Sequence, residues 1–207
     1  MEPHVAEDED LEKLKSWWKT NGTSILVGIA LGLGGLGGYN GWVFYTESQA
    51  ESASNLFSQF RVAVNDEKPE SAALLAGELR EDYAGSPYTA SAQLILARDQ
   101  FQAGDATAAR DSLNWVISNA DDISLKHTAR LRLAYIELAE GNGQKALDLL
   151  STDSVEGFTS QYAELKADAH ASLGEIEKAR AKYDEAINSL PAGSAYMDIL
   201  KAKQAGL

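Results

Sequence analysis

Few side chains in this sequence of 207 residues have the type and spacing that catalysis or metal binding requires. Cysteine is absent, which excludes thiolate catalysis, disulfide bonds and Cys-based zinc sites. The three histidines, His4, His127 and His170, do not have the spacing of a metal site. The acidic pairs at 121–122 and 184–185 fit loop or solvated helix charge better than an acid–base pair. We therefore expect a protein that is not an enzyme and that needs no cofactor and no metal ion.

One glycine pattern imitates a dinucleotide-binding loop. Gly32, Gly34 and Gly37 match the pattern G-x-G-x-x-G, and Glu51 follows about 20 residues later. That motif requires a strand before the glycines and a helix after them, within a βαβ unit. Here the glycines lie inside a continuous apolar stretch, so we interpret them as part of a membrane helix.

The charge balance excludes two further classes of protein. Lysine and arginine number 18 against 31 acidic residues, which gives a formal net charge of −13 at pH 7. A nucleic-acid-binding protein needs a basic face to neutralise phosphates. A protein held to anionic lipid by charge alone needs basic clusters too. We therefore expect no nucleic acid among the partners. A small-molecule substrate is not expected either.

Residues 25–44 carry no charged side chain and predict a membrane-spanning helix. A helix of about 20 residues spans roughly 30 Å, the hydrocarbon thickness of a bilayer. Lysines precede this stretch at 13, 15 and 19, whereas residues 46–60 contain no Lys or Arg. Because positively charged flanks stay in the cytoplasm, we expect the amino terminus inside and the large carboxyl-terminal part outside.

We assign the transmembrane anchor to residues 24–45, and a cleaved signal peptide is the alternative. The apolar region of a signal peptide is about 7–15 residues long, shorter than this one. Several glycines lie at G-x-x-x-G spacing, which lets two helix backbones approach, so a lateral transmembrane helix partner is a candidate. The residues assigned to the anchor are Ile25, Gly28, Gly32, Gly34, Gly38, Gly41, Trp42 and Phe44.

Residues 1–23 form the predicted cytoplasmic segment. Its first ten residues are rich in Asp and Glu and are expected to be disordered. Leu11, Leu14 and Trp18 share one face of a helix with lysines alongside, which predicts a short amphipathic helix at the inner membrane surface. The same segment could instead bind a cytoplasmic regulator.

Residues 46–207 predict a domain of helices without strands. Apolar stripes with the helical period recur, as at Ala179, Tyr183 and Ala186, and Gly or Pro residues separate them. The predicted helices span residues 47–65, 69–83, 87–103, 106–119, 124–140, 143–151, 158–173, 175–189 and 195–204.

A repeat emerges from three glycines, Gly104, Gly141 and Gly174, at intervals close to the roughly 34-residue period of tetratricopeptide repeats. An alanine precedes and another follows each glycine at a fixed distance, which would let two helices of a hairpin cross closely. The residues assigned to repeat packing are Ala97, Gly104, Ala109, Ala134, Gly141, Ala146, Ala167, Gly174 and Ala179. The predicted fold is all-α: one transmembrane helix, then a tetratricopeptide-like α-solenoid of three to four degenerate helical hairpins. An ordinary helical bundle is the alternative.

Such a solenoid offers a partner a concave face and has no intrinsic chemistry. Repeats that clamp a terminal carboxylate use Lys and Asn on this face, but Leu94, Leu131 and Glu164 stand where the Lys would be. We therefore expect no clamp for a terminal carboxylate. The candidate groove residues in repeat register are Ser91, Leu94, Arg98, Thr128, Leu131, Tyr135, Gln161, Glu164 and Asp168.

The order of these segments resembles the YfgM family of Gram-negative bacteria. The resemblance covers the whole chain and is most specific from Trp17 to Trp42, where W-W-K-T-N-G leads into the glycine-rich span. It implies a single-pass inner-membrane protein with its repeats in the periplasm. It also implies association with the SecYEG translocon and with the periplasmic chaperone PpiD, and a role in receiving exported, unfolded chains.

Two other functions remain open at the level of the sequence. The chain could be a scaffold for a different periplasmic envelope-assembly complex. It could also tether a cytoplasmic signalling regulator through residues 1–23.

Overall fold

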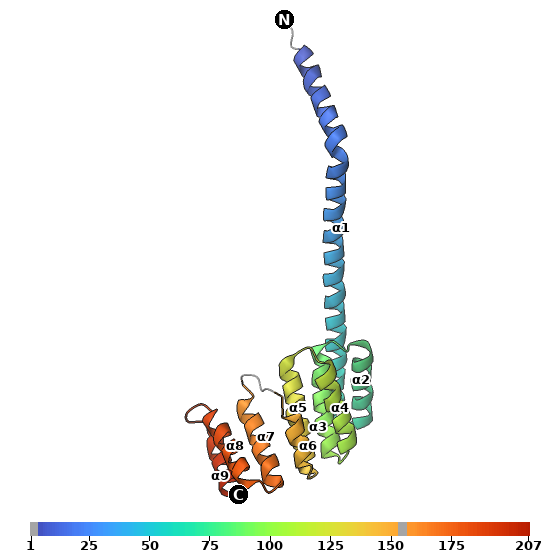
Figure 1. Ribbon diagram of the computed structural model, residues 1–207. Coiled ribbons are helices and arrows are strands. Elements are labelled where there is room, and N and C mark those ends of the chain that lie inside the picture. The colour runs from blue at the N-terminus through green and yellow to red at the C-terminus, as the bar shows by residue number, and fades with distance from the viewer. Residues whose placement is uncertain (1–3, 153–156) are drawn as a thin grey trace. The chain divides into compact units, whose positions relative to one another are not determined.

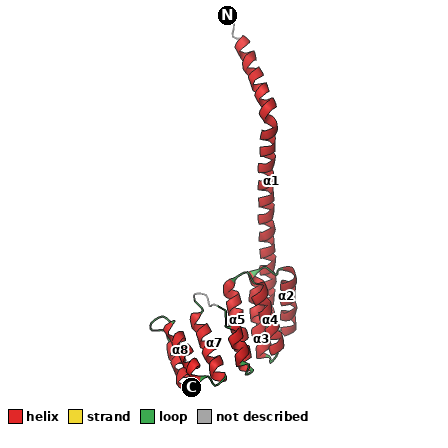
Figure 2. Cartoon of the chain, viewed as in Figure 1, coloured by secondary structure: helices red, strands yellow, loops and turns green. Residues whose placement is uncertain are grey.

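The computed structural model describes residues 4–152 and 157–207, with side chains from Leu11 onwards. Residues 1–3 of the predicted tail and residues 153–156 of the predicted carboxyl-terminal domain lie outside the described residues. Within the two described ranges the chain consists of helices joined by loops, without a strand (Figure 2). The prediction of an all-α fold is confirmed.

The helices divide into one long amino-terminal helix and a series of shorter ones. From α2 onwards each begins and ends within two residues of its predicted limits. Their bounds are α1 (His4–Asn65), α2 (Pro69–Asp82), α3 (Pro87–Gln102), α4 (Ala106–Asn119), α5 (Ile123–Ala139), α6 (Gly143–Leu149), α7 (Thr159–Ser172), α8 (Ile176–Asn188) and α9 (Tyr196–Ala205).

The amino-terminal third of the chain forms one continuous helix, whereas the prediction divided it into several segments. We expected a disordered tail, an amphipathic helix, a membrane span and a separate helix from 47 to 65. The structure places His4–Asn65 in the single helix α1. No proline interrupts this stretch, and its glycines lower helix propensity by only about 1 kcal/mol each, too little to end a helix that is supported on both sides.

Within the described residues, α1 is long and apolar enough, by length and composition, to cross a membrane. Its large apolar side chains are exposed, among them Leu31 at 71% and Phe44 at 74%. Such exposure is costly in water and favourable in lipid. These observations fit a membrane-anchored protein.

The chain separates into two compact units, Met1–Glu51 and Ser52–Leu207. We call the second unit the repeat array. In it, α3 pairs with α4, α5 with α6 and α7 with α8, and α9 packs against α8 (Figure 1). The end of α1 packs with α2 through Phe60 and Leu79, as expected for a degenerate first hairpin.

The three repeat glycines occupy the same backbone position. Gly104, Gly141 and Gly174 have φ values of 86°, 78° and 74°, in the left-handed region that favours glycine. The next residue in each case donates its amide to a carbonyl five residues back, as Asn142 does to Glu137 at 2.8 Å. The glycine therefore ends one helix and turns the chain into the next.

The core of the repeat array is rich in alanine. It consists of four clusters of buried side chains, each shared by neighbouring helices, as expected for a solenoid. Small side chains at the crossings let the helices of a hairpin approach closely. The six alanines assigned to repeat packing are each at most 2% exposed: Ala97, Ala109, Ala134, Ala146, Ala167 and Ala179.

Replacing Gly141 by alanine is expected to lower the free energy of unfolding by about 1 kcal/mol, since the left-handed conformation costs an L-residue that much. A Cβ atom at Gly141 would meet nothing within 4 Å, so backbone strain is the whole effect. Gly77→Ala is the matched control. Gly77 lies inside helix α2 with open space around a Cβ, so that variant should be up to about 1 kcal/mol more stable. Equal urea midpoints for the two variants would contradict the assignment.

Candidate functional site

A cavity of about 690 Å³ is lined by residues of α3, α5, α7 and α9, together with Leu113 of α4. We call it the inner cavity. Most of its lining residues come from α3, α5 and α7, the first helices of three successive hairpins, as the repeat register predicts. Six of the predicted groove residues line it, namely Arg98, Leu131, Tyr135, Gln161, Glu164 and Asp168.

The other three predicted groove residues do not line the inner cavity. Ser91 and Thr128 turn their hydroxyl groups back to their own helices, donating to the carbonyl oxygens of Pro87 and Ser124 at 2.8 and 2.9 Å. Leu94 is 6% exposed and packs in the core between α3 and α5. The register therefore locates the cavity but not the direction of each side chain.

The wall of the cavity formed by α3 and α5 carries aromatic and basic side chains. The rings of Phe101 and Tyr135 meet edge to face with their centroids 6.2 Å apart, and Tyr135 is 58% exposed. Arg132 donates from Nη1 to the carbonyl oxygen of Leu94 at 2.8 Å, which links α5 to α3. This wall places apolar surface beside the guanidinium groups of Arg98 and Arg132.

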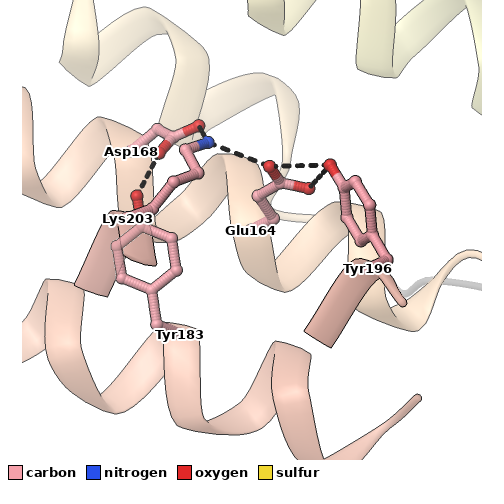
Figure 3. Close-up of polar contacts among 5 residues, drawn as sticks. All are labelled: Glu164, Asp168, Tyr183, Tyr196 and Lys203. Carbon is pink, nitrogen blue, oxygen red and sulfur yellow. Dashed lines mark hydrogen bonds and ion pairs between the residues drawn. The ribbon is translucent and has the colours of Figure 1, made fainter. Parts of the chain in front are cut away.

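The facing wall carries a cluster of ionisable side chains from α7, α8 and α9 (Figure 3). The ammonium group of Lys203 lies between two carboxylates, 2.9 Å from Glu164 Oε1 and 2.6 Å from Asp168 Oδ2. The hydroxyl group of Tyr196 lies 3.0 and 2.8 Å from the two oxygens of Glu164, and that of Tyr183 donates to Asp168. Both carboxylates thus already accept hydrogen bonds from within the chain.

The cluster stabilises the neutral tyrosines and the charged lysine. Burial, followed by the hydrogen bond to Asp168, raises the pKa of Tyr183. Burial alone would lower the pKa of Lys203, but the hydrogen bonds to Asp168 and Glu164 outweigh it and raise that pKa. At neutral pH, Lys203 of α9 therefore binds Glu164 and Asp168 of α7 through charge-assisted hydrogen bonds.

Sequence reasoning missed eight residues that line the inner cavity, among them Phe101, Arg132, Tyr196 and Lys203. Phe101 and Arg132 lie on the predicted helices but outside the register positions that we used. Tyr196 and Lys203 belong to α9, which has no repeat glycine to align it. The signal that could have found α9 is its position, since it takes the place of the first helix of a fourth hairpin.

The two histidines whose side chains are described, His127 and His170, lie in packing positions. His127 is buried, with Nδ1 2.7 Å from Tyr162 Oη and its ring stacked on Phe158. Burial, and after it the charge of Arg130, lowers the pKa of His127. The Nδ1 atom of His170 lies 2.6 Å from the carboxylate of Glu175. No group of His, Cys, Asp and Glu in the part of the chain that the structure describes could hold a metal ion.

The residues assigned to the anchor all lie on α1. Trp42 and Phe44 are 66% and 74% exposed. A Cβ atom at any of its five assigned glycines would meet nothing within 4 Å, so the described chain places no other segment against them. These positions of α1 are open to lipid or to another membrane helix.

Comparison with protein families and curated proteins gives consistent matches. The family of tetratricopeptide repeat-like domains matches residues 15–207. A protein from Escherichia coli strain K12 is 29% identical over 96% of this chain and 97% of its own length. Proteins from Haemophilus influenzae (27% identical, over 89% of this chain and 90% of the relative) and Neisseria gonorrhoeae (26% identical, over 98% of both chains) are similar as well. All three carry the name ancillary SecYEG translocon subunit. No solved structure matches the chain.

Proposed function

Because the chain belongs to the tetratricopeptide repeat-like family, and its YfgM relatives are named ancillary SecYEG translocon subunits, we propose that it is a membrane-anchored scaffold of the Sec translocon. The match along nearly the full length of these relatives carries the proposal. It covers both the helix that can cross a membrane and the repeat array. The resemblance to the YfgM family that the sequence indicated is confirmed by these relatives.

The scaffold is not an enzyme. Tetratricopeptide-like repeats bind partners through extended surfaces and bring no chemistry of their own. The ionisable side chains of the inner cavity support this, because Glu164, Asp168 and Lys203 bond to one another rather than facing an open reaction site.

The proposed topology has the amino terminus in the cytoplasm and the repeat array in the periplasm, across the bacterial inner membrane. The lysines before the apolar stretch of α1 support it. Since the chain has no cysteine, single cysteines can report each side. In intact spheroplasts, a membrane-impermeant maleimide should label Asn65→Cys and leave Glu12→Cys unlabelled until the membrane is opened. The reverse pattern would invert the topology.

The proposed partners are the SecYEG translocon, which the names of the relatives support, and the chaperone PpiD, which rests on the family resemblance alone. In this role the scaffold would hold the translocon close to periplasmic chaperones that receive exported chains. Two parts of the molecule are available for contacts. The glycine positions of α1 can meet a membrane helix, and the inner cavity can meet a soluble segment.

The proposal is tested by purifying the tagged full-length protein in mild detergent and identifying its partners by mass spectrometry. We expect SecYEG and PpiD to co-purify. A chain of residues 46–207, which lacks the anchor, shows which partner is held by the repeat array. Recovery of another envelope complex or a cytoplasmic regulator, without the translocon, would overturn the proposal.

A further inference from the structure

We propose that the inner cavity binds the side-chain carboxylate of an internal Asp or Glu in an extended segment of a partner protein, with Arg132 as the principal ligand. The inference rests on the proposed scaffold function and specifies the chemistry of its binding site. Four features of the cavity carry it: its cations, their mutual repulsion, the neighbouring apolar surface and the shape of the groove.

Among the charged side chains of the cavity, the two carboxylates are already bonded and unused donors remain on the arginines. Glu164 and Asp168 are occupied by Lys203 and the two tyrosines. A guanidinium group has five N–H donors, and Arg132 uses one of them, on the carbonyl oxygen of Leu94. Among the described residues, Arg132 forms no ion pair. Its remaining donors fit an acceptor that bears negative charge.

The two guanidinium groups of this wall repel each other. Burial, and then the charge of Arg98, lowers the pKa of Arg132. Arg98 is itself paired with Asp99 at 2.8 Å, so its charge is partly offset, whereas that of Arg132 is not. A carboxylate bound at Arg132 would offset this repulsion and pair a cation that has no ion-pair partner among the described residues.

Apolar surface surrounds this position. Phe101, Tyr135, Leu131 and Leu165 line the same cavity, and the ring of Tyr135 is largely exposed. A volume of about 690 Å³ lies within the usual range of ligand pockets, roughly 300–1,000 Å³. The cavity therefore suits a few side chains in which an acidic residue has aromatic or aliphatic neighbours.

Two further cavities adjoin this one. A second cavity of about 650 Å³, reaching to Pro69 at the start of α2, has Arg98 and Gln102 as walls in common with it. A third, of about 700 Å³, has Gln161 and Tyr196 in common with it at the other end. Recesses that follow one another along the array fit the successive side chains of an extended polypeptide better than a compact small molecule. The net charge of −13 argues against nucleic acid as the occupant.

The test measures fluorescence anisotropy of labelled peptides with the full-length protein in mild detergent. The probe is the amidated peptide Gly-Ser-Leu-Phe-Glu-Leu-Ser-Gly, and the matched peptide has glutamine in place of glutamate. We expect about tenfold tighter binding of the glutamate peptide. A third peptide, with glutamine and a free carboxyl terminus, should bind like the second, because the cavity accepts an internal side chain.

Three variants assign the preference to Arg132. Arg132→Gln should bind both peptides equally, and Arg132→Lys, which keeps the charge, should retain part of the preference. Arg180→Gln is the matched control, since Arg180 is exposed on α8 and does not line the cavity. Equal binding of the two peptides by the unaltered protein, or an undiminished preference in Arg132→Gln, would overturn the inference. Retention of SecYEG by the unaltered protein in the same detergent tests the scaffold function separately.

Discussion

Replacing Phe60 by alanine is expected to lower the free energy of unfolding of the repeat array by about 3–5 kcal/mol. Phe60 is completely buried and packs with Ala72, Ala76 and Leu79 of α2, so truncation would leave a cavity in the core of the first hairpin. The loss is a large part of the roughly 5–15 kcal/mol that stabilises a typical domain.

Urea unfolding of a chain of residues 46–207 measures this effect with two signals. Trp115 is the single tryptophan of that chain. The guanidinium group of Arg80 of α2 lies 5.3 Å from its ring centroid, so its fluorescence reports on the contact between α4 and the first hairpin, whereas circular dichroism reports on all helices. If the first hairpin folds cooperatively with the rest, both transitions shift together. If it unfolds alone, the fluorescence changes at low urea with a minor part of the dichroism, and most of the dichroism is lost at higher urea.

Val62→Ala is the control for Phe60→Ala. Val62 lies on the same helix but is 56% exposed, so its truncation should cost well under 1 kcal/mol. Equal stability of the two variants would show that the first hairpin is not packed as described here.

Replacing Arg110 by methionine is expected to cost about 3 kcal/mol, because the buried carboxylate of Glu137 would keep, among the described residues, only the ammonium group of Lys145, 4.0 Å away, as a cation. Arg110 Nε donates to Glu137 Oε1 at 2.6 Å, and Arg110 also binds Glu140, which joins α4 to α5. Asn142 donates to Glu137 Oε2 at 2.9 Å. The double variant Arg110→Met with Glu137→Met should recover most of the loss.

The pH dependence of Arg110→Met separates this electrostatic effect from lost packing. Burial alone would raise the pKa of Glu137, but the hydrogen bonds from Arg110 and Asn142 lower it below its ordinary value of 4.5. In the unaltered protein this contribution is present above pH 4.5 and is lost as the pH falls. In Arg110→Met burial should dominate, so protonation favours folding. The stability gap should narrow below pH 4.5, and a constant gap would contradict the assignment.

Much of the fold follows from local features of the sequence. The side chains of Ser86, Asp105 and Asp122 act as caps at the starts of α3, α4 and α5. These three helices begin within one residue of their predicted starts. The continuity of α1 was missed because a change of environment along a helix, from lipid to protein, does not itself end the helix.

Some of the predicted groove residues line the inner cavity, and others do not. The register placed Arg98, Tyr135 and Asp168 in one cavity because they occupy equivalent positions in three hairpins. It also selected Leu94, which is buried, and Ser91 and Thr128, which bond to their own helices. A rotation of a helix by a fraction of a turn decides between these outcomes, and packing against neighbouring helices sets that rotation.

The sequence by itself determined the apolar span, the helices and the glycine–alanine repeat, since each depends on short-range periodicity or on the conformational freedom of one residue. Only the tertiary structure decided that Arg132 and Lys203 share a cavity and that Glu164 and Asp168 are already bonded. These contacts join residues more than 30 positions apart. They depend on how the hairpins stack, and local propensity carries no information about that.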